Sequence, residues 1–61
     1  MSKLKEIIKE RTIEKMELGL TFEPAIHDVI EEIKHKFSSL KEMNRQNIEF
    51  LKDDIYKMIY E

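Results

Sequence analysis

Apolar residues recur every three or four positions along most of the chain, a spacing that predicts amphipathic helices. The only glycine and the only proline, Gly19 and Pro24, lie close together and mark one turn. Gly19 suits the position just after a helix, because it adopts a left-handed conformation at little cost. Thr21 is a good N-cap, and proline is tolerated in the first turn of a helix. We therefore predict one helix over residues 2–18 and the start of another near residue 22.

The second helix carries an apolar stripe that keeps its spacing almost to the end of the chain. The first part of the stripe consists of Phe22, Ile26, Val29, Ile30, Ile33, Phe37 and Leu40. A polar run at residues 44–47 interrupts it, and Ile48, Leu51, Ile55, Met58 and Ile59 then restore it. No glycine, proline or aspartate marks a turn at the interruption, and the spacing does not shift. One helix over residues 22–60 is therefore the first interpretation.

A break near Ser38 and Ser39 is the second interpretation, because residues 39–42 match the S-x-x-E capping box that begins many helices. Either interpretation gives an all-α fold in one domain that spans residues 1–61. We predict an antiparallel helical hairpin with a long second helix, bent or broken near Ser38 and Ser39, within an oligomeric helical bundle.

A second helix of this length would extend well beyond the first, so the later part of its stripe would be exposed in a monomer. Exposed apolar surface of that extent usually marks an interface. A chain of 61 residues is also marginally stable alone, and this one has no cysteine for a disulfide. We therefore predict a homodimer or a larger oligomer. The predicted self-association surface consists of Ile48, Leu51, Ile55, Met58, Ile59, Asn44 and Asn47.

Asn44 and Asn47 have two interpretations within this surface. Buried asparagines at core positions fix the register and the oligomeric state of helical assemblies, at a cost in stability. Alternatively, both side chains lie at the solvated edge of the stripe.

The usual sequence signatures of enzymes are missing. One glycine cannot build a phosphate-binding loop, and there is no nucleophile elbow and no Cys–His pair. His27, Glu31 and His35 follow one another at a spacing of four, and residues 32–35 match the E-x-x-H pattern of di-iron bundles. The glutamate and histidine of that pattern point away from the apolar stripe, so a solvated polar face is the favoured interpretation. We therefore predict a non-enzymatic protein without a metal or a cofactor.

Protein binding is the function that these exclusions favour. Tyr56 and Tyr60 are expected to stack on the helix face opposite the apolar stripe, with Phe50 at the flank of the stripe. Exposed aromatic residues are common anchors of protein interfaces, and Asp53 makes their surroundings acidic. We predict a small regulator or inhibitor of the phage, plasmid or bacterial type, which occludes or bridges a partner protein through these four residues. A second self-association surface is the alternative use of the same residues.

Nucleic-acid binding and structural assembly remain alternative functions. The charge is nearly balanced, with 11 basic and 13 acidic residues, so no segment forms the basic footprint of a non-specific nucleic-acid binder. A dimeric nucleic-acid-binding regulator would use Lys3, Lys5, Lys9 and Arg45. In size and expected layout the chain resembles the small plasmid-encoded RNA-binding helical-hairpin dimers, although it shares no motif with them. Without a membrane-spanning apolar run or a secretory h-region, we expect a cytoplasmic protein of a bacterial, archaeal or virus-infected cell.

Overall fold

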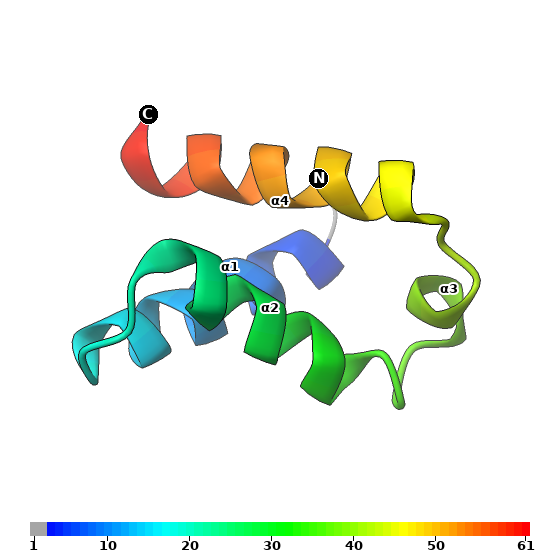
Figure 1. Cartoon of the computed structure of the whole chain (residues 1–61), viewed down its shortest axis with the longest axis horizontal. Helices are drawn as coiled ribbons and strands as arrows, with labels where there is room; N and C mark the ends of the chain where they lie inside the picture. The colour runs from blue at the N-terminus through cyan, green and yellow to red at the C-terminus, as the bar shows by residue number, and fades with distance from the viewer. Residues whose placement is uncertain (1–2) are drawn as a thin grey trace.

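The chain folds into four helices, which a computed structural model describes over residues 3–61 (Figure 1). They are α1 (Lys3–Glu17), α2 (Phe22–Ile33), α3 (Ser38–Lys41) and α4 (Arg45–Tyr60). The predicted all-α fold class is confirmed, since residues 3–61 contain no strand. In this part of the chain, no helix has both the length and the apolar character needed to cross a bilayer.

The turn between α1 and α2 follows the prediction closely. Gly19 has a left-handed backbone, with φ of 112°. Its N–H donates to the carbonyl of Met16 over 3.0 Å, and the N–H of Leu20 donates to the carbonyl of Lys15 over 3.2 Å. These two bonds form a Schellman motif, which satisfies carbonyls at the end of α1. Thr21 is the N-cap of α2, although its side chain makes no capping hydrogen bond. The expected helix start at Ser2 lies outside the described residues.

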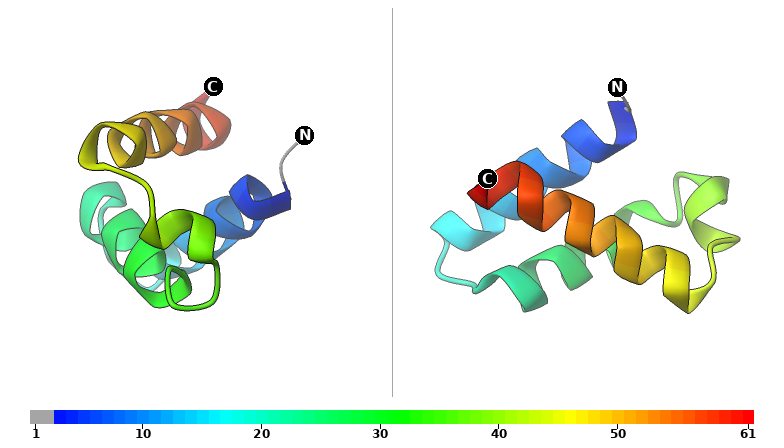
Figure 2. Two further views of the ribbon diagram at one scale, coloured as in Figure 1. Left: turned by 90° about the vertical axis from the view of Figure 1, so that its right-hand side faces the viewer. Right: turned by 90° about the horizontal axis from the view of Figure 1, so that it is seen from above.

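The segment between α2 and α4 shows that the continuous helix expected over residues 22–60 is wrong, and that the chain breaks near Ser38 and Ser39 as in the second interpretation, with α3 beginning at Ser38. α2 ends at Ile33, and the backbone is extended at Phe37 (φ −120°, ψ 106°) and at Asn44 (φ −78°, ψ 172°). These two residues redirect the chain, so that α4 folds back over α1 and α2 (Figures 1 and 2). The break is favoured because it buries the apolar face of α4 within the same chain, whereas a continuous helix would leave that face in water.

The helix caps in this segment also differ from the expectation. Phe37, rather than Ser38 or Ser39, is the N-cap of α3, so the capping box does not begin this helix. Asn44 is the N-cap of α4, and its side-chain oxygen accepts a 2.8 Å hydrogen bond from the backbone N–H of Asn47. Asparagine is among the best N-cap residues, because its short side chain reaches the unpaired N–H groups of the first turn.

The helices are arranged around α1. Seen from above, α1 and α2 diverge from their shared turn, and α4 runs across both (Figure 2). α2 and α4 each pack against α1, whereas they approach each other less closely. All four helices contribute buried side chains to one core, which consists of Ile8, Ile26, Val29, Ile30, Ile33, Leu40, Leu51 and Ile55.

The apolar stripe of α4 therefore has a different role from the predicted one. Leu51 and Ile55 are buried in the core of their own chain, and Ile48, Met58 and Ile59 are half-buried against it. Because the chain covers this stripe itself, the stripe is no longer a reason to expect a dimer. Asn44 and Asn47 are both exposed at the first turn of α4, so neither lies in a buried core position.

Candidate binding groove between α2 and α4

An aromatic cluster lies where the start of α2 meets the end of α4. The rings of Tyr56 and Tyr60 are 4.6 Å apart between centroids. Phe22 meets them edge-on, with centroid distances of 5.3 Å to Tyr56 and 6.2 Å to Tyr60. Both distances fall in the range that favours aromatic pairs. The two tyrosine rings are neighbours, but they are tilted by 39° rather than stacked in parallel, and the contact with Phe22 adds α2 to the same cluster.

A groove extends from this cluster between α2 and α4. Its first part, which we call the aromatic section, has a volume of about 280 Å³ and is lined by Phe22, Glu23, Glu49, Lys52, Asp53 and Tyr56. Its second part, which we call the basic section, has a volume of about 520 Å³. Glu49 and Lys52 line both sections, so the two hollows are adjacent along α4.

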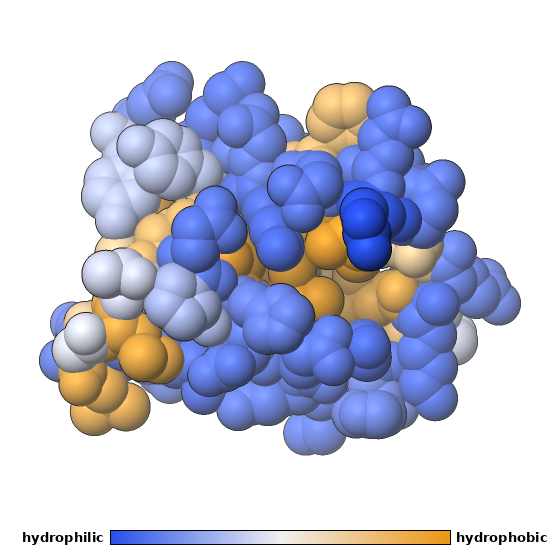
Figure 3. Space-filling model, in the orientation of Figure 1, coloured by the Kyte–Doolittle hydropathy of each residue, from blue (hydrophilic) through white to orange (hydrophobic). Residues whose placement is uncertain are grey.

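The basic section has an apolar floor and a charged rim. The floor residues are Ile30, Leu40, Met43 and Ile48. Ile30 and Leu40 also belong to the core, so the floor is continuous with the packed interior. A space-filling view shows apolar side chains at the bottom of a hollow that hydrophilic residues surround (Figure 3).

The rim of the basic section carries an excess of positive charge. Four basic residues line it, namely Lys34, Lys41, Arg45 and Lys52, against the two carboxylates of Glu31 and Glu49. Both carboxylates are already paired, one with Lys34 over 3.0 Å and the other with Lys52 over 3.5 Å. Among the described residues, no ion pair or hydrogen bond engages the side chains of Lys41 and Arg45. These two cations are therefore available to a ligand.

The ionisation of Glu31 agrees with this positive surrounding. The hydrogen bond from Lys34 is the main cause that lowers the pKa of Glu31. Desolvation acts in the opposite direction, and electrostatic interaction with Lys34, His27 and His35 lowers the pKa further. Glu31 is therefore held as a carboxylate by its neighbours.

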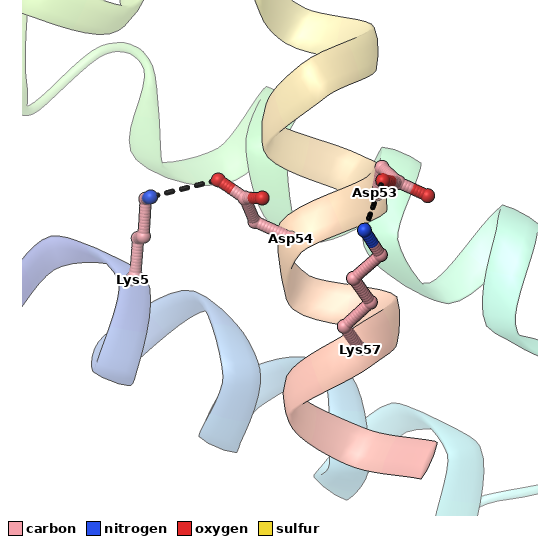
Figure 4. Close-up of polar contacts among 4 residues, drawn as sticks. All are labelled: Lys5, Asp53, Asp54 and Lys57. Carbon is pink, nitrogen blue, oxygen red and sulfur yellow. Dashed lines mark hydrogen bonds and ion pairs between the residues drawn. The ribbon is translucent and has the colours of Figure 1, made fainter. Parts of the chain in front are cut away.

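The aromatic section has the opposite charge balance. Its three carboxylates, from Glu23, Glu49 and Asp53, outnumber the single lysine, Lys52. Asp53 also pairs with Lys57 over 3.4 Å within α4 (Figure 4). One end of the groove is thus acidic and aromatic, and the other is basic and apolar.

The structure places the predicted partner-binding residues near this groove, but not all inside it. Tyr56 and Asp53 line the aromatic section. Tyr60 belongs to the aromatic cluster, and Phe50 is 60% exposed on α4 without lining either section. The four residues therefore share the exposed side of one helix.

Sequence reasoning missed the basic section completely. Lys34 is the C-cap of α2, Lys41 ends α3 and Arg45 begins α4. These residues are spaced seven and four positions apart, as on one face of a helix, but only the folding back of α4 brings them to one hollow. His27 also lines this section, at a helix face that the sequence indicated to be solvated.

The lysines and the arginine that the nucleic-acid alternative requires do not form one surface. Lys5 donates a 2.8 Å hydrogen bond to Asp54 and so joins α1 to the middle of α4 (Figure 4). Arg45 lies nine positions before Asp54, roughly 14 Å away along the helix axis. The cation of Lys5 is thus neutralised locally, while Arg45 belongs to the groove. Lys3 and Lys9 are on α1, away from the groove.

No metal-binding group is present in residues 3–61, since no three His, Cys, Asp or Glu side chains there are placed to hold an ion.

Comparisons with models of protein families, with curated proteins and with solved structures give no match to this chain.

Proposed function

We propose that this chain is a small non-enzymatic protein-binding regulator, which holds a segment of a partner protein in the groove between α2 and α4. Binding there would occlude the partner's segment or bridge it to a second protein. The observation that carries the proposal is the exposure of aromatic side chains beside a groove with an apolar floor. Phe50, Tyr56 and Tyr60 are 60%, 45% and 52% exposed.

These aromatic residues are not needed to complete the core. The buried positions of α4 are Leu51 and Ile55, which lie on the opposite side from the exposed rings. Aromatic side chains bury a large area at a small entropic cost, and for this reason they dominate the binding energy of many interfaces. Grooves between helices are also a common site for an amphipathic helix from a partner.

Self-association remains a prediction, but it requires a different surface from the one first expected. Leu51 and Ile55 are occupied inside the chain, so a second copy would have to contact exposed apolar residues such as Phe50, or Leu18 at the α1–α2 turn. Nucleic-acid binding and structural assembly also remain predictions, and the residues named for the nucleic-acid alternative do not share one surface among residues 3–61.

Site-specific photo-crosslinking tests the proposed function. A photoreactive phenylalanine analogue would replace Tyr56 in the groove, and in a control chain it would replace Glu14, which is exposed on α1. Both chains would be expressed in cells that naturally carry the gene. We expect one discrete adduct from position 56 and none from position 14, and we expect Tyr60→Ala to reduce its yield while circular dichroism stays unchanged.

Three outcomes would oppose this proposal. An adduct at twice the mass of the chain would indicate self-association instead. An adduct with nucleic acid would support the nucleic-acid alternative. Equal labelling from positions 56 and 14 would show that the groove has no particular role.

A further inference from the structure

We infer that the segment bound in the groove is an amphipathic helix with opposite charges at its two ends, and that its acidic end lies over Lys41 and Arg45. This inference rests on the proposed function, because it describes the partner of the same groove. It is carried by the opposite charge of the two groove sections and by the unpaired cations at one end.

Charge complementarity sets the position of each end of the partner. In the basic section, Lys34 and Lys52 already pair with carboxylates, whereas Lys41 and Arg45 have no such partner among the described residues. Carboxylates of the bound helix would complete these pairs, and arginine in particular binds carboxylates with two parallel hydrogen bonds.

At the other end, the aromatic section offers carboxylates to a basic group. Glu23 has no ion pair within residues 3–61, and Asp53 has only the 3.4 Å contact with Lys57. Lysine or arginine at this end of the partner would face both carboxylates and the faces of the aromatic cluster. Cations are attracted to aromatic faces, which adds to the ion pairing.

The shape of the groove favours a helix as the bound segment. The groove extends along α4 from Arg45 to Tyr56, a distance of roughly 16 Å, which three turns of a partner helix would match. Its floor of Ile30, Leu40 and Ile48 would receive apolar side chains spaced three and four residues apart. A segment bound as an added β-strand would need an open sheet edge for its backbone, and residues 3–61 contain no strand.

The same charge pattern disfavours a nucleic acid in this groove. A phosphate backbone carries negative charge along its whole length and requires cations along its path. Here the carboxylates of Glu23 and Asp53 lie at one end of that path. A protein segment whose charge changes sign along its length meets both ends favourably.

Fluorescence anisotropy with designed peptides tests this inference. The probe is a labelled helix of about 14 residues, with leucines on one face, glutamates in one half and lysines in the other. A comparison peptide has the same composition, with glutamates and lysines evenly mixed. We expect the probe to bind about tenfold more tightly than the mixed peptide, as two or more surface ion pairs together would provide. The preference should decrease as salt is raised.

Two matched protein variants locate the effect. Lys41→Glu with Arg45→Glu reverses the two free cations of the groove, and glutamate is tolerated at the start of α4 because the helix dipole favours it there. Lys3→Glu with Arg11→Glu makes the same change of charge at exposed positions on α1. We expect the first variant to lose the tenfold preference and the second to keep it within about twofold. A peptide with lysines in both halves should bind the first variant more tightly than it binds the wild type.

Each contrary result overturns the inference in a recognisable way. If the probe and the mixed peptide bind equally, and Tyr56→Ala weakens both, the groove binds helices but its charges do not select them. The proposed function would then stand without this inference. If neither peptide binds while crosslinking from position 56 succeeds, the bound segment is not a helix of this kind. If a labelled oligonucleotide displaces the probe, the occupant is a nucleic acid.

Discussion

Ile55 provides the most direct test of the fold, because it distinguishes a core within one chain from a core shared between chains. Its side chain is fully buried among residues of α1, α2 and α4. Replacement by valine removes one methylene group, which costs about 0.8 kcal/mol in transfer free energy and 0.5–1.5 kcal/mol in typical cores once the remaining cavity is included. Replacement by alanine would cost about 2–5 kcal/mol, which approaches the whole stability of roughly 3–9 kcal/mol expected for a chain of this length. Valine is therefore the informative substitution.

Urea unfolding followed by circular dichroism measures this effect. Since small proteins lose about 1 kcal/mol of unfolding free energy per molar urea, Ile55→Val should lower the midpoint by about 1 M. Ile59→Val is the matched control, because it makes the same chemical change at a half-buried position of the same helix. We expect the control to lower the midpoint by less than half as much.

The dependence of the urea midpoint on protein concentration decides whether the core belongs to one chain. For the fold described here, the midpoint should not change between dilute and concentrated samples. If Ile55 were buried only between two chains, a hundredfold rise in concentration would add about 2.7 kcal/mol to the unfolding free energy. An increase of this size in the unfolding free energy would refute the packing of α4 on its own chain. Equal effects of Ile55→Val and Ile59→Val would refute it as well.

Three further predictions concern single contacts. Asn44→Ala should reduce the unfolding free energy by about 1 kcal/mol through loss of the α4 cap, whereas Asn47→Ala should have little effect, because only its backbone N–H takes part; equal losses in urea unfolding would contradict the capping role. Lys5 lowers the pKa of Asp54, mainly through its hydrogen bond. The stability that this pair contributes should therefore be complete above the ordinary pKa of aspartate, near 3.8. It should be lost as the pH falls through the lower pKa that Asp54 has in the folded state. In an NMR titration, Lys5→Met should return the pKa of Asp54 to its ordinary range, and an unchanged value would exclude this cause. Gly19→Ala should cost about 1–2 kcal/mol of unfolding free energy from backbone strain alone, since an added Cβ meets nothing within 4 Å. D-alanine at this position should be tolerated, as thermal unfolding would show. An equal cost for both substitutions would contradict strain as the cause.

The elements that local chemistry determines could be predicted from the sequence. Gly19 ends the first helix through a backbone conformation that other residues rarely adopt, and Thr21 precedes the next helix as its N-cap. The buried face of α2 follows the helical spacing of Ile26, Val29 and Ile33. In each case a few neighbouring residues suffice to set the structure.

The break between α2 and α4 could not be predicted from spacing, because the spacing continues through it. Ile33, Leu40 and Leu51 belong to one core in the folded chain, and the same positions would line one face of a continuous helix. The available signal was Asn44, whose preference for N-caps competes with its use inside a helix. What decides between the two structures is the burial of the α4 stripe against α1 and α2, a gain that local patterns do not show.

The groove follows from that same long-range choice, and this explains why the recess could not be predicted. In a continuous helix, Lys34 and Arg45 would share one face but would lie eleven residues apart, roughly 16 Å along the axis. The extended residues Phe37 and Asn44 bring both to the rim of one hollow. The fold-back therefore removes an apolar stripe from solvent and at the same time creates a basic recess over the floor that remains. Substitutions that favour a continuous helix, such as replacement of Asn44 by a strong helix former, would thus reduce stability and binding together, while charge reversal at Arg45 should affect binding alone.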